Sequence, residues 1–182
     1  MKKIASAILF VSVFFGCATL ANAASTEAAT TYKLAQQSAD ANYKLAHTQC
    51  ESLTGVPKKV CIMEAEVDRT HTKASAKAEF EHTPRARTNA RIAIANAEYD
   101  LAKAKCESQT GNAKDVCIKE AKAINTSAKA DAKTHATVVK ARAEGNDEKL
   151  EANYKVALEK CDAFAGTAKD DCVASAKAQY GK

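Results

Sequence analysis

The sequence is poor in large apolar residues. Residues 24–182 contain only 21 Leu, Ile, Val and Phe, which is about 13% of that length. This content is below the level at which disorder becomes likely, although the low net charge argues against complete disorder. A wide apolar core is therefore excluded.

Sequence motifs for catalysis and cofactor binding are also missing. The chain has no nucleophile elbow, no phosphate-binding glycine loop and no helical pair of metal-binding histidines. Its net charge of +5 is only mildly basic, so we expect no specific nucleic-acid partner. We therefore expect a protein that is not an enzyme and has no cofactor.

The first 23 residues have the organisation of a secretory signal peptide. Two lysines precede an apolar segment at residues 4–15, and "ANA" ending at Ala23 matches the small-residue pattern of a cleavage site. The apolar segment is too short for a membrane span and no longer one follows, so we expect no transmembrane span in the mature chain. We predict cleavage after Ala23 and a periplasmic location. The alternative is a lipoprotein processed at Cys17, because "FFGC" loosely resembles a lipobox.

Alanine replaces the missing large apolar residues. It fills 35 positions between residues 24 and 182. Alanine is the best helix former but buries little apolar area. We therefore expect slim, closely packed helices that need an additional source of stability.

A twelve-residue element occurs three times along the chain. It reads "CESLTGVPKKVC" at 50–61, "CESQTGNAKDVC" at 106–117 and "CDAFAGTAKDDC" at 161–172. Each copy has a glycine five residues after its first cysteine and a lysine three residues after that glycine. A tyrosine seven residues upstream and an alanine four residues upstream also recur. Repetition in this detail indicates one supersecondary unit used three times.

The repeated unit is typical of a helical hairpin. From Tyr32 to Leu53, apolar residues recur every three or four positions, which is one face of a helix. The central glycine, such as Gly111, suits the left-handed position that ends a helix. The next residue, such as Asn112 or Thr167, suits the N-cap of a second helix.

The cysteine spacing predicts a disulfide inside each hairpin. A reversal at the central glycine places both cysteines about 7–9 Å along antiparallel helices, at ~1.5 Å per residue. Helices packed through alanine approach to roughly 8–10 Å, which leaves room for the ~5.5 Å Cα separation of a disulfide. We therefore predict the pairs Cys50–Cys61, Cys106–Cys117 and Cys161–Cys172. Each would contribute about 3 kcal/mol in the chain-entropy model.

These observations predict an all-α fold of three tandem antiparallel helical hairpins in an elongated or loosely bundled array. The expected parts are a flexible N-terminus at 24–31 and hairpin repeats at 32–82, 83–145 and 146–182. Thr83 and Pro84 are expected to begin a helix. Gly145 is expected to end one, with Asn146 as the next N-cap, which gives six helices in total.

Few residues indicate ligand chemistry. Arg85, Arg87 and Arg91 come close together with no acid between them, and they form a candidate site for phosphate or acidic polysaccharide. The alternative is that these arginines are solvated residues at the start of a helix and bind no ligand. We interpret the histidines as surface residues: His47, His71, His82 and His135. We interpret the repeated tyrosines as packing residues: Tyr43, Tyr99 and Tyr154.

The cysteines also have a second interpretation. In reduced form a pair binds a soft metal or acts as a redox couple, although such motifs usually place their cysteines closer together. Evenly paired cysteines in an exported chain are usually structural. A metal- or redox-responsive envelope protein using Cys and His stays as the alternative.

The residues "AKAKCESQTGNAKDVCIKEAKA" and the ending "CDAFAGTAKDDCVASAKAQYGK" resemble a group of secreted proteobacterial proteins. These proteins are rich in Ala and Lys, repeat Cys-x10-Cys hairpins and are sometimes labelled TolA-like or cell envelope biogenesis proteins. The resemblance covers nearly the whole chain after the leader and implies an envelope location. It brings no catalytic or binding residues. We expect a scaffold, spacer or protein-binding module, whose envelope partner and oligomeric state the sequence does not name.

Overall fold

The computed structural model describes residues 20–182, and this part of the chain contains helices and turns but no strand. The helices are α1 (Leu20–Cys50), α2 (Gly55–Glu81), α3 (Pro84–Cys106), α4 (Gly111–Cys161) and α5 (Thr167–Tyr180). The all-α prediction is confirmed. Cys17 lies outside the described residues. The segment 24–31, predicted to be flexible, is part of α1.

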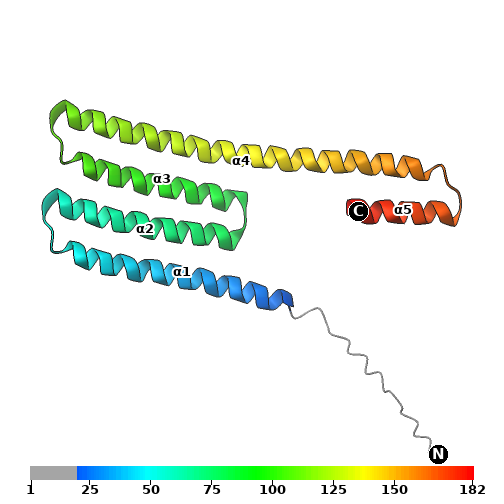
Figure 1. Ribbon diagram of the computed structural model, residues 1–182, viewed down its shortest axis with the longest axis horizontal. Coiled ribbons are helices and arrows are strands. Elements are labelled where there is room, and N and C mark those ends of the chain that lie inside the picture. Colours follow the sequence, from blue (N-terminus) through cyan, green and yellow to red (C-terminus); the bar gives the residue numbers. More distant parts are fainter. Residues whose placement is uncertain (1–19) are drawn as a thin grey trace, which may run out of the picture.

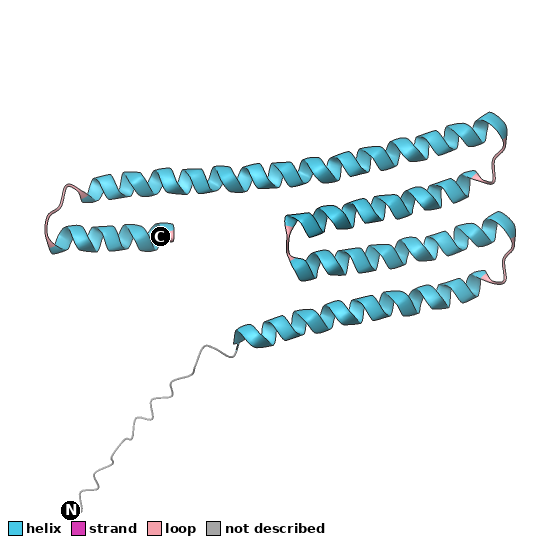
Figure 2. Ribbon diagram, turned by 180° about the vertical axis from the view of Figure 1, so that it is seen from behind, coloured by secondary structure: helices cyan, strands magenta, loops and turns pink. Residues whose placement is uncertain are grey.

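The helices run back and forth and lie side by side in one layer (Figure 1). Within residues 20–182, each helix packs only against the helices next to it in the chain: α1 on α2, α2 on α3, α3 on α4 and α4 on α5. The view from behind shows the same arrangement (Figure 2). The layer is therefore one helix thick and leaves both broad faces open. The predicted elongated array of disulfide hairpins is confirmed.

Helix α4 is shared by two hairpins. It is 51 residues long; its first part packs on α3 and its last part on α5, and neither partner reaches its middle (Figure 1). The prediction that Gly145 ends a helix and Asn146 caps the next is wrong, because α4 continues through both residues and the helices number five in the described chain. A helical glycine costs only about 1 kcal/mol relative to alanine, which good helix formers on both sides offset.

The core of this layer is made of small side chains. Every residue buried in the described chain is an alanine or a cysteine. The three largest fully buried side chains are Cys50, Cys106 and Cys161, each at most 1% exposed. The expected slim helices are therefore present, and a disulfide sulfur fills the place that a large apolar side chain has in other helix pairs.

The turn inside each hairpin differs from the expected one. The first helix already ends at the first cysteine, and the Leu53 N–H donates to the Cys50 carbonyl at 3.0 Å. The glycine then starts the second helix with a left-handed φ of +62° at Gly55 and +55° at Gly111. Thr110 occupies the N-cap position that we predicted for Asn112, and Gly166 the one predicted for Thr167. The chain therefore reverses before the glycine, and the positive φ of the glycine directs the chain into the second helix.

The turn between α2 and α3 follows the sequence prediction. His82 ends α2 in a left-handed conformation with φ 50°, and its N–H donates to the Ala78 carbonyl at 3.1 Å. Thr83 then caps α3, because its Oγ1 accepts the Ala86 N–H at 3.0 Å, and Pro84 is the first helical residue. This short turn sets α2 and α3 side by side.

Candidate functional site

The six repeat cysteines form the three predicted disulfides. Their Cα atoms are 5.7 Å apart in Cys50–Cys61, 5.8 Å in Cys106–Cys117 and 5.6 Å in Cys161–Cys172. These separations lie in the ordinary range for disulfides. The arrangement fits an oxidising compartment outside the cytoplasm.

The recurring lysine of the repeat closes the turn in two hairpins. Lys58 Nζ lies 2.7 Å from the Glu51 carboxylate, and Lys169 Nζ lies 2.7 Å from the Asp162 carboxylate. The hydrogen bond from Lys58 lowers the pKa of Glu51, and the hydrogen bond to Asp162 raises the pKa of Lys169. The lysine therefore ties the start of the second helix to the residue after the first cysteine.

In the second hairpin the acid after the first cysteine pairs with a lysine of another hairpin. Glu107 pairs with Lys59 of the first hairpin, and this hydrogen bond lowers the pKa of Glu107. Lys105 also reaches the first hairpin, with its Nζ 2.9 Å from the Glu64 carboxylate. These two ion pairs join the tips of the first two hairpins, which lie at the same edge of the layer (Figure 1).

The repeated tyrosines lie against cations rather than in a common pocket. The Arg69 guanidinium is 5.0 Å from the ring centre of Tyr43, and Lys182 Nζ is 5.8 Å from that of Tyr154. Arg69 belongs to α2 and Lys182 follows α5, so both cations come from the opposite side of the hairpin turn. Tyr99 instead contacts Lys103 of its own helix at 4.8 Å. Packing across the hairpin is therefore seen for two of the three tyrosines.

The structure separates the three arginines of the candidate anion site. Arg85 lines a hollow between α2 and α3, whereas Arg87 and Arg91 line a groove between α3 and α4. Positions two residues apart differ by about 200° around a helix, so Arg85 points to the other side of the layer from Arg87. In the described chain no carboxylate forms an ion pair with Arg85, Arg87 or Arg91, as the ion pairs from α3 start from other residues.

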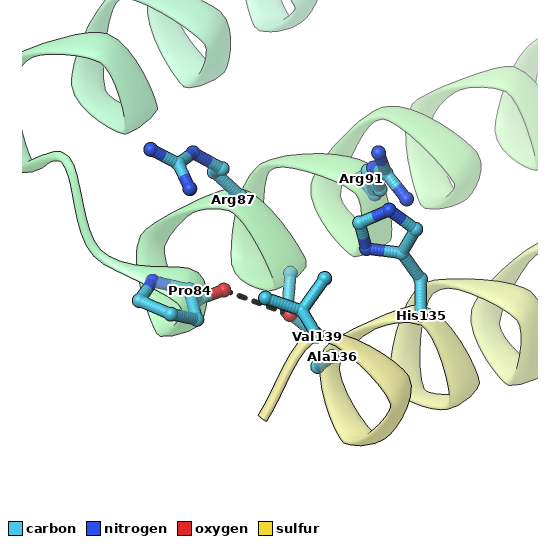
Figure 3. Close-up of a pocket in the computed structure, with 7 residues that line it drawn as sticks. Pro84, Arg87, Arg91, His135, Ala136 and Val139 are labelled. Carbon is cyan, nitrogen blue, oxygen red and sulfur yellow. Dashed lines mark hydrogen bonds between the residues drawn. The ribbon is translucent and has the colours of Figure 1, made fainter. Parts of the chain in front are cut away.

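Arg91 has a partner that the sequence did not suggest. Its guanidinium lies beside the ring of His135 from α4, while Arg87 points away from both (Figure 3). The groove around them is completed by Pro84, Thr88 and Val139. Two nitrogen-bearing side chains that meet at a groove are suited to hold a small anionic group.

Helix α4 also exposes a row of branched apolar side chains. Val116, Ile124, Val138 and Val156 are 43%, 70%, 41% and 53% exposed. At about 100° per residue they fall within an arc of roughly 80° on one side of the helix, which the exposed Glu120 and Asp131 share. We call these four residues the apolar face of α4. The apolar spacing that predicted the hairpin contacts did not reveal this face.

Among the residues that the structure describes, no three His, Cys, Asp or Glu side chains come together as a metal-binding group. His47 is 3.5 Å from the Glu51 carboxylate and tilts against the Tyr43 ring. No described helix is both long enough and apolar enough to cross a bilayer.

Comparison with known proteins returned no similar family model, no similar curated protein and no similar solved structure. The three Cys-x10-Cys helical hairpins are shown by the structure itself. Membership of the secreted Ala/Lys-rich group stays a prediction from the sequence.

Proposed function

We propose that this protein is a non-enzymatic helical scaffold of the bacterial envelope that binds a protein partner along α4. The apolar face of α4 carries this proposal. Four exposed branched side chains on one side of a 51-residue helix, between eight and eighteen residues apart and with Glu120 and Asp131 among them, offer an extended partner separate apolar contacts along α4.

The shape of the molecule supports this role. At ~1.5 Å per residue, α4 is about 75 Å long, and repeated helical units are suited to present such long surfaces to partners. The narrow alanine packing offers little room for a reaction cavity, because binding pockets for small substrates are enclosed and mostly apolar. The structure is therefore better suited to bind a surface than a small molecule.

The predicted leader and the three disulfides support a periplasmic location. A signal peptide with cleavage after Ala23 directs the chain out of the cytoplasm. Disulfides form and persist in the oxidising periplasm. The scaffold would meet its partner there.

A pull-down from envelope extract tests the proposal. The bait proteins are wild type, an Ile124→Lys/Val138→Lys variant and a Thr126→Lys/Thr137→Lys control with the same charge change on another side of α4. We expect a protein that wild type and control retain and that the Ile124→Lys/Val138→Lys variant loses. Equal retention by all three baits would contradict binding through the apolar face.

A second candidate function is binding of an anionic envelope polymer through Arg91 and His135. The observation that favours it is their convergence in the groove between α3 and α4 (Figure 3). Binding to lipopolysaccharide at low and high salt tests it. We expect an Arg91→Gln variant to bind more weakly than an Arg142→Gln control, because Arg142 is exposed and lines no part of the groove. Equal binding would reject this site.

A further inference from the structure

The lysines of α4 gather on one side of the helix. Lys122, Lys129, Lys133 and Lys140 fall within an arc of about 40°, at ~100° per residue. Three of them are exposed and Lys129 is half-buried. The row therefore follows the helix axis for roughly 27 Å, at ~1.5 Å per residue.

Apart from Glu144, which lies beside the row, the acids nearest to these lysines in the sequence lie on another side of α4. Glu120 and Asp131 are separated from the centre of the lysine row by about 170° around the helix. In the described chain Lys122 and Lys133 form no ion pair, and Lys140 only approaches Glu144, at 3.6 Å between two well-exposed side chains. The positive charge of the row is therefore largely uncompensated.

The neighbouring helix α3 extends this positive surface. Lys129 Nζ donates to the Asn96 side chain of α3 at 3.2 Å, which fixes the side of α3 that adjoins the row. Arg85 lies eleven residues before Asn96, about three helical turns, and so points to the same side. Lys77 of α2 lines the same hollow as Arg85, but its Nζ lies 3.6 Å from the Glu81 carboxylate, which lines that hollow too. We call Arg85 and the four lysines of the row the basic face.

The basic face is flat and carries few apolar groups. The layer is one helix thick, so its broad faces have no helix above them (Figures 1 and 2). The exposed apolar face of α4 lies about 160° away from the lysine row around the helix. Lysine side chains on a flat surface can reach a second flat surface together.

We infer that the basic face binds the surface of a bilayer that contains anionic lipids. A planar array of headgroup phosphates matches both the flat shape and the charge of this face. Single-stranded nucleic acid fits it less well, because stacking on bases needs aromatic side chains and the sequence between Lys122 and Lys140 has no Phe, Tyr or Trp. Binding would be peripheral, because no apolar side chain of the row inserts among the lipid chains.

This inference goes beyond the proposed protein partner, because it assigns the other side of α4 to a lipid surface. The two roles are compatible: a scaffold lying on its basic face would present the apolar face of α4 away from the membrane. Loss of one role does not remove the other, since the two faces share no residue.

Vesicle co-sedimentation tests the inference. A Lys122→Gln/Lys133→Gln/Lys140→Gln variant removes three charges from the row, and an Arg142→Gln/Lys149→Gln/Lys160→Gln control removes three from another side of α4. The vesicles contain phosphatidylglycerol in phosphatidylcholine or phosphatidylcholine alone. All proteins keep the same N-terminal segment, so any lipid binding by that segment is common to them.

We expect wild type and control to bind phosphatidylglycerol vesicles and the row variant to bind about 100-fold more weakly, at roughly fivefold per lysine. Binding should fall steeply with salt. Circular dichroism on each variant verifies that the helices are intact. Equal weakening in variant and control would overturn the assignment. So would tighter binding to duplex DNA than to the vesicles at the same salt.

Discussion

The first two hairpins and the C-terminal hairpin contain the same disulfide element in different surroundings. Helices α2 and α3 each pack against two neighbours, whereas α5 packs only against α4. Five residues are buried in α3 and a single alanine, Ala176, in α5. The same covalent link therefore joins a supported helix pair in one region and a nearly unsupported one in the other.

Side-chain contacts increase this difference. In the first hairpin the rings of Tyr32 and Phe80 stack at 4.8 Å, and Asp40 binds both Arg69 at 2.7 Å and Lys73 at 3.0 Å. In the C-terminal hairpin the contacts far from the disulfide come from the last residues of the chain, where Tyr180 tilts against Tyr154. An isolated helix of about 14 residues is marginal in water, so α5 depends on its disulfide more than α2 does.

The largest expected effect comes from removing one disulfide at a time. Replacing both cysteines by serine costs about 3 kcal/mol of unfolding free energy in either hairpin by the chain-entropy model. We expect Cys161→Ser/Cys172→Ser to release α5 and Cys50→Ser/Cys61→Ser to leave α2 paired with α1 and α3. Hydrogen exchange of the backbone amides measures this. The α5 amides should lose protection in the first variant, while the α2 amides keep theirs in the second.

Equal loss of protection in α2 and α5 would show that the neighbouring helices contribute little. The control is the Cys106→Ser/Cys117→Ser variant. We expect it to behave like the first-hairpin variant, because α3 also packs against α2.

Enlarging a buried alanine sharpens the same comparison. Ala104, in α3, is 1% exposed, and Ala176, in α5, is 5% exposed. Ala104→Leu should reduce the unfolding free energy by about 1–3 kcal/mol, because α3 is held on both sides and cannot move away. Ala176→Leu should cost less, since α5 is free to shift on α4. Urea unfolding curves of both variants provide the test, and a greater loss for Ala176→Leu would contradict it.

A smaller effect is expected at Gly145, which lies in the part of α4 between the two regions. Its backbone is helical and a Cβ there would meet no atom within 4 Å. Gly145→Ala should stabilise α4 by about 0.5–1 kcal/mol. Gly111→Ala, at φ +55°, should instead destabilise the second hairpin. Thermal melts of the two variants should shift in opposite directions, and shifts of the same sign would refute the continuous α4.

The smallest effect is expected from acidification. Hydrogen bonds from Lys73 and Arg69 lower the pKa of Asp40, and a hydrogen bond from Lys182 lowers that of Glu151. A lowered folded pKa means that each pair stabilises the fold above the ordinary carboxyl pKa near ~4 and is lost as the pH falls through the lowered value. Exposed pairs contribute little, so the change is small.

Melts between pH 7 and pH 2 measure this contribution. We expect Asp40→Asn to flatten the pH dependence more than Glu151→Gln does. Arg69 and Lys73 both hydrogen-bond Asp40, whereas Lys182 hydrogen-bonds Glu151 and Lys155 only approaches it, at 3.9 Å. An identical pH dependence in wild type and Asp40→Asn would show that the pair has no role in stability.

The sequence was sufficient to predict the hairpins and their disulfides because both depend on local spacing. A central glycine, a fixed distance between cysteines and the bulk of alanine determine which sulfurs meet. The Thr83 cap was equally predictable, since a capping side chain and the helix it begins are adjacent in the chain. The turn itself was placed wrongly, because a glycine with positive φ serves the end of one helix or the start of the next.

The candidate sites were harder to predict, because they depend on helical phase and on register between helices. Arg85, Arg87 and Arg91 are close in sequence, yet about 200° of rotation separates the first two. His135 meets Arg91 only through the antiparallel register that Cys106–Cys117 sets. Because the predicted disulfide implies that register, the Arg91–His135 contact could also have been predicted from the sequence. The continuity of α4 could not, because a single helical glycine costs too little stability to mark the end of a helix.

The central claim is that the three disulfides replace the apolar core that this sequence lacks. Circular dichroism melts of the protein, with and without reductant, test it most directly. The account predicts a strongly helical oxidised protein whose melting temperature falls by at least about 10 °C on reduction. An unchanged melting temperature after complete reduction would contradict it, because alanine packing alone would then hold the layer together.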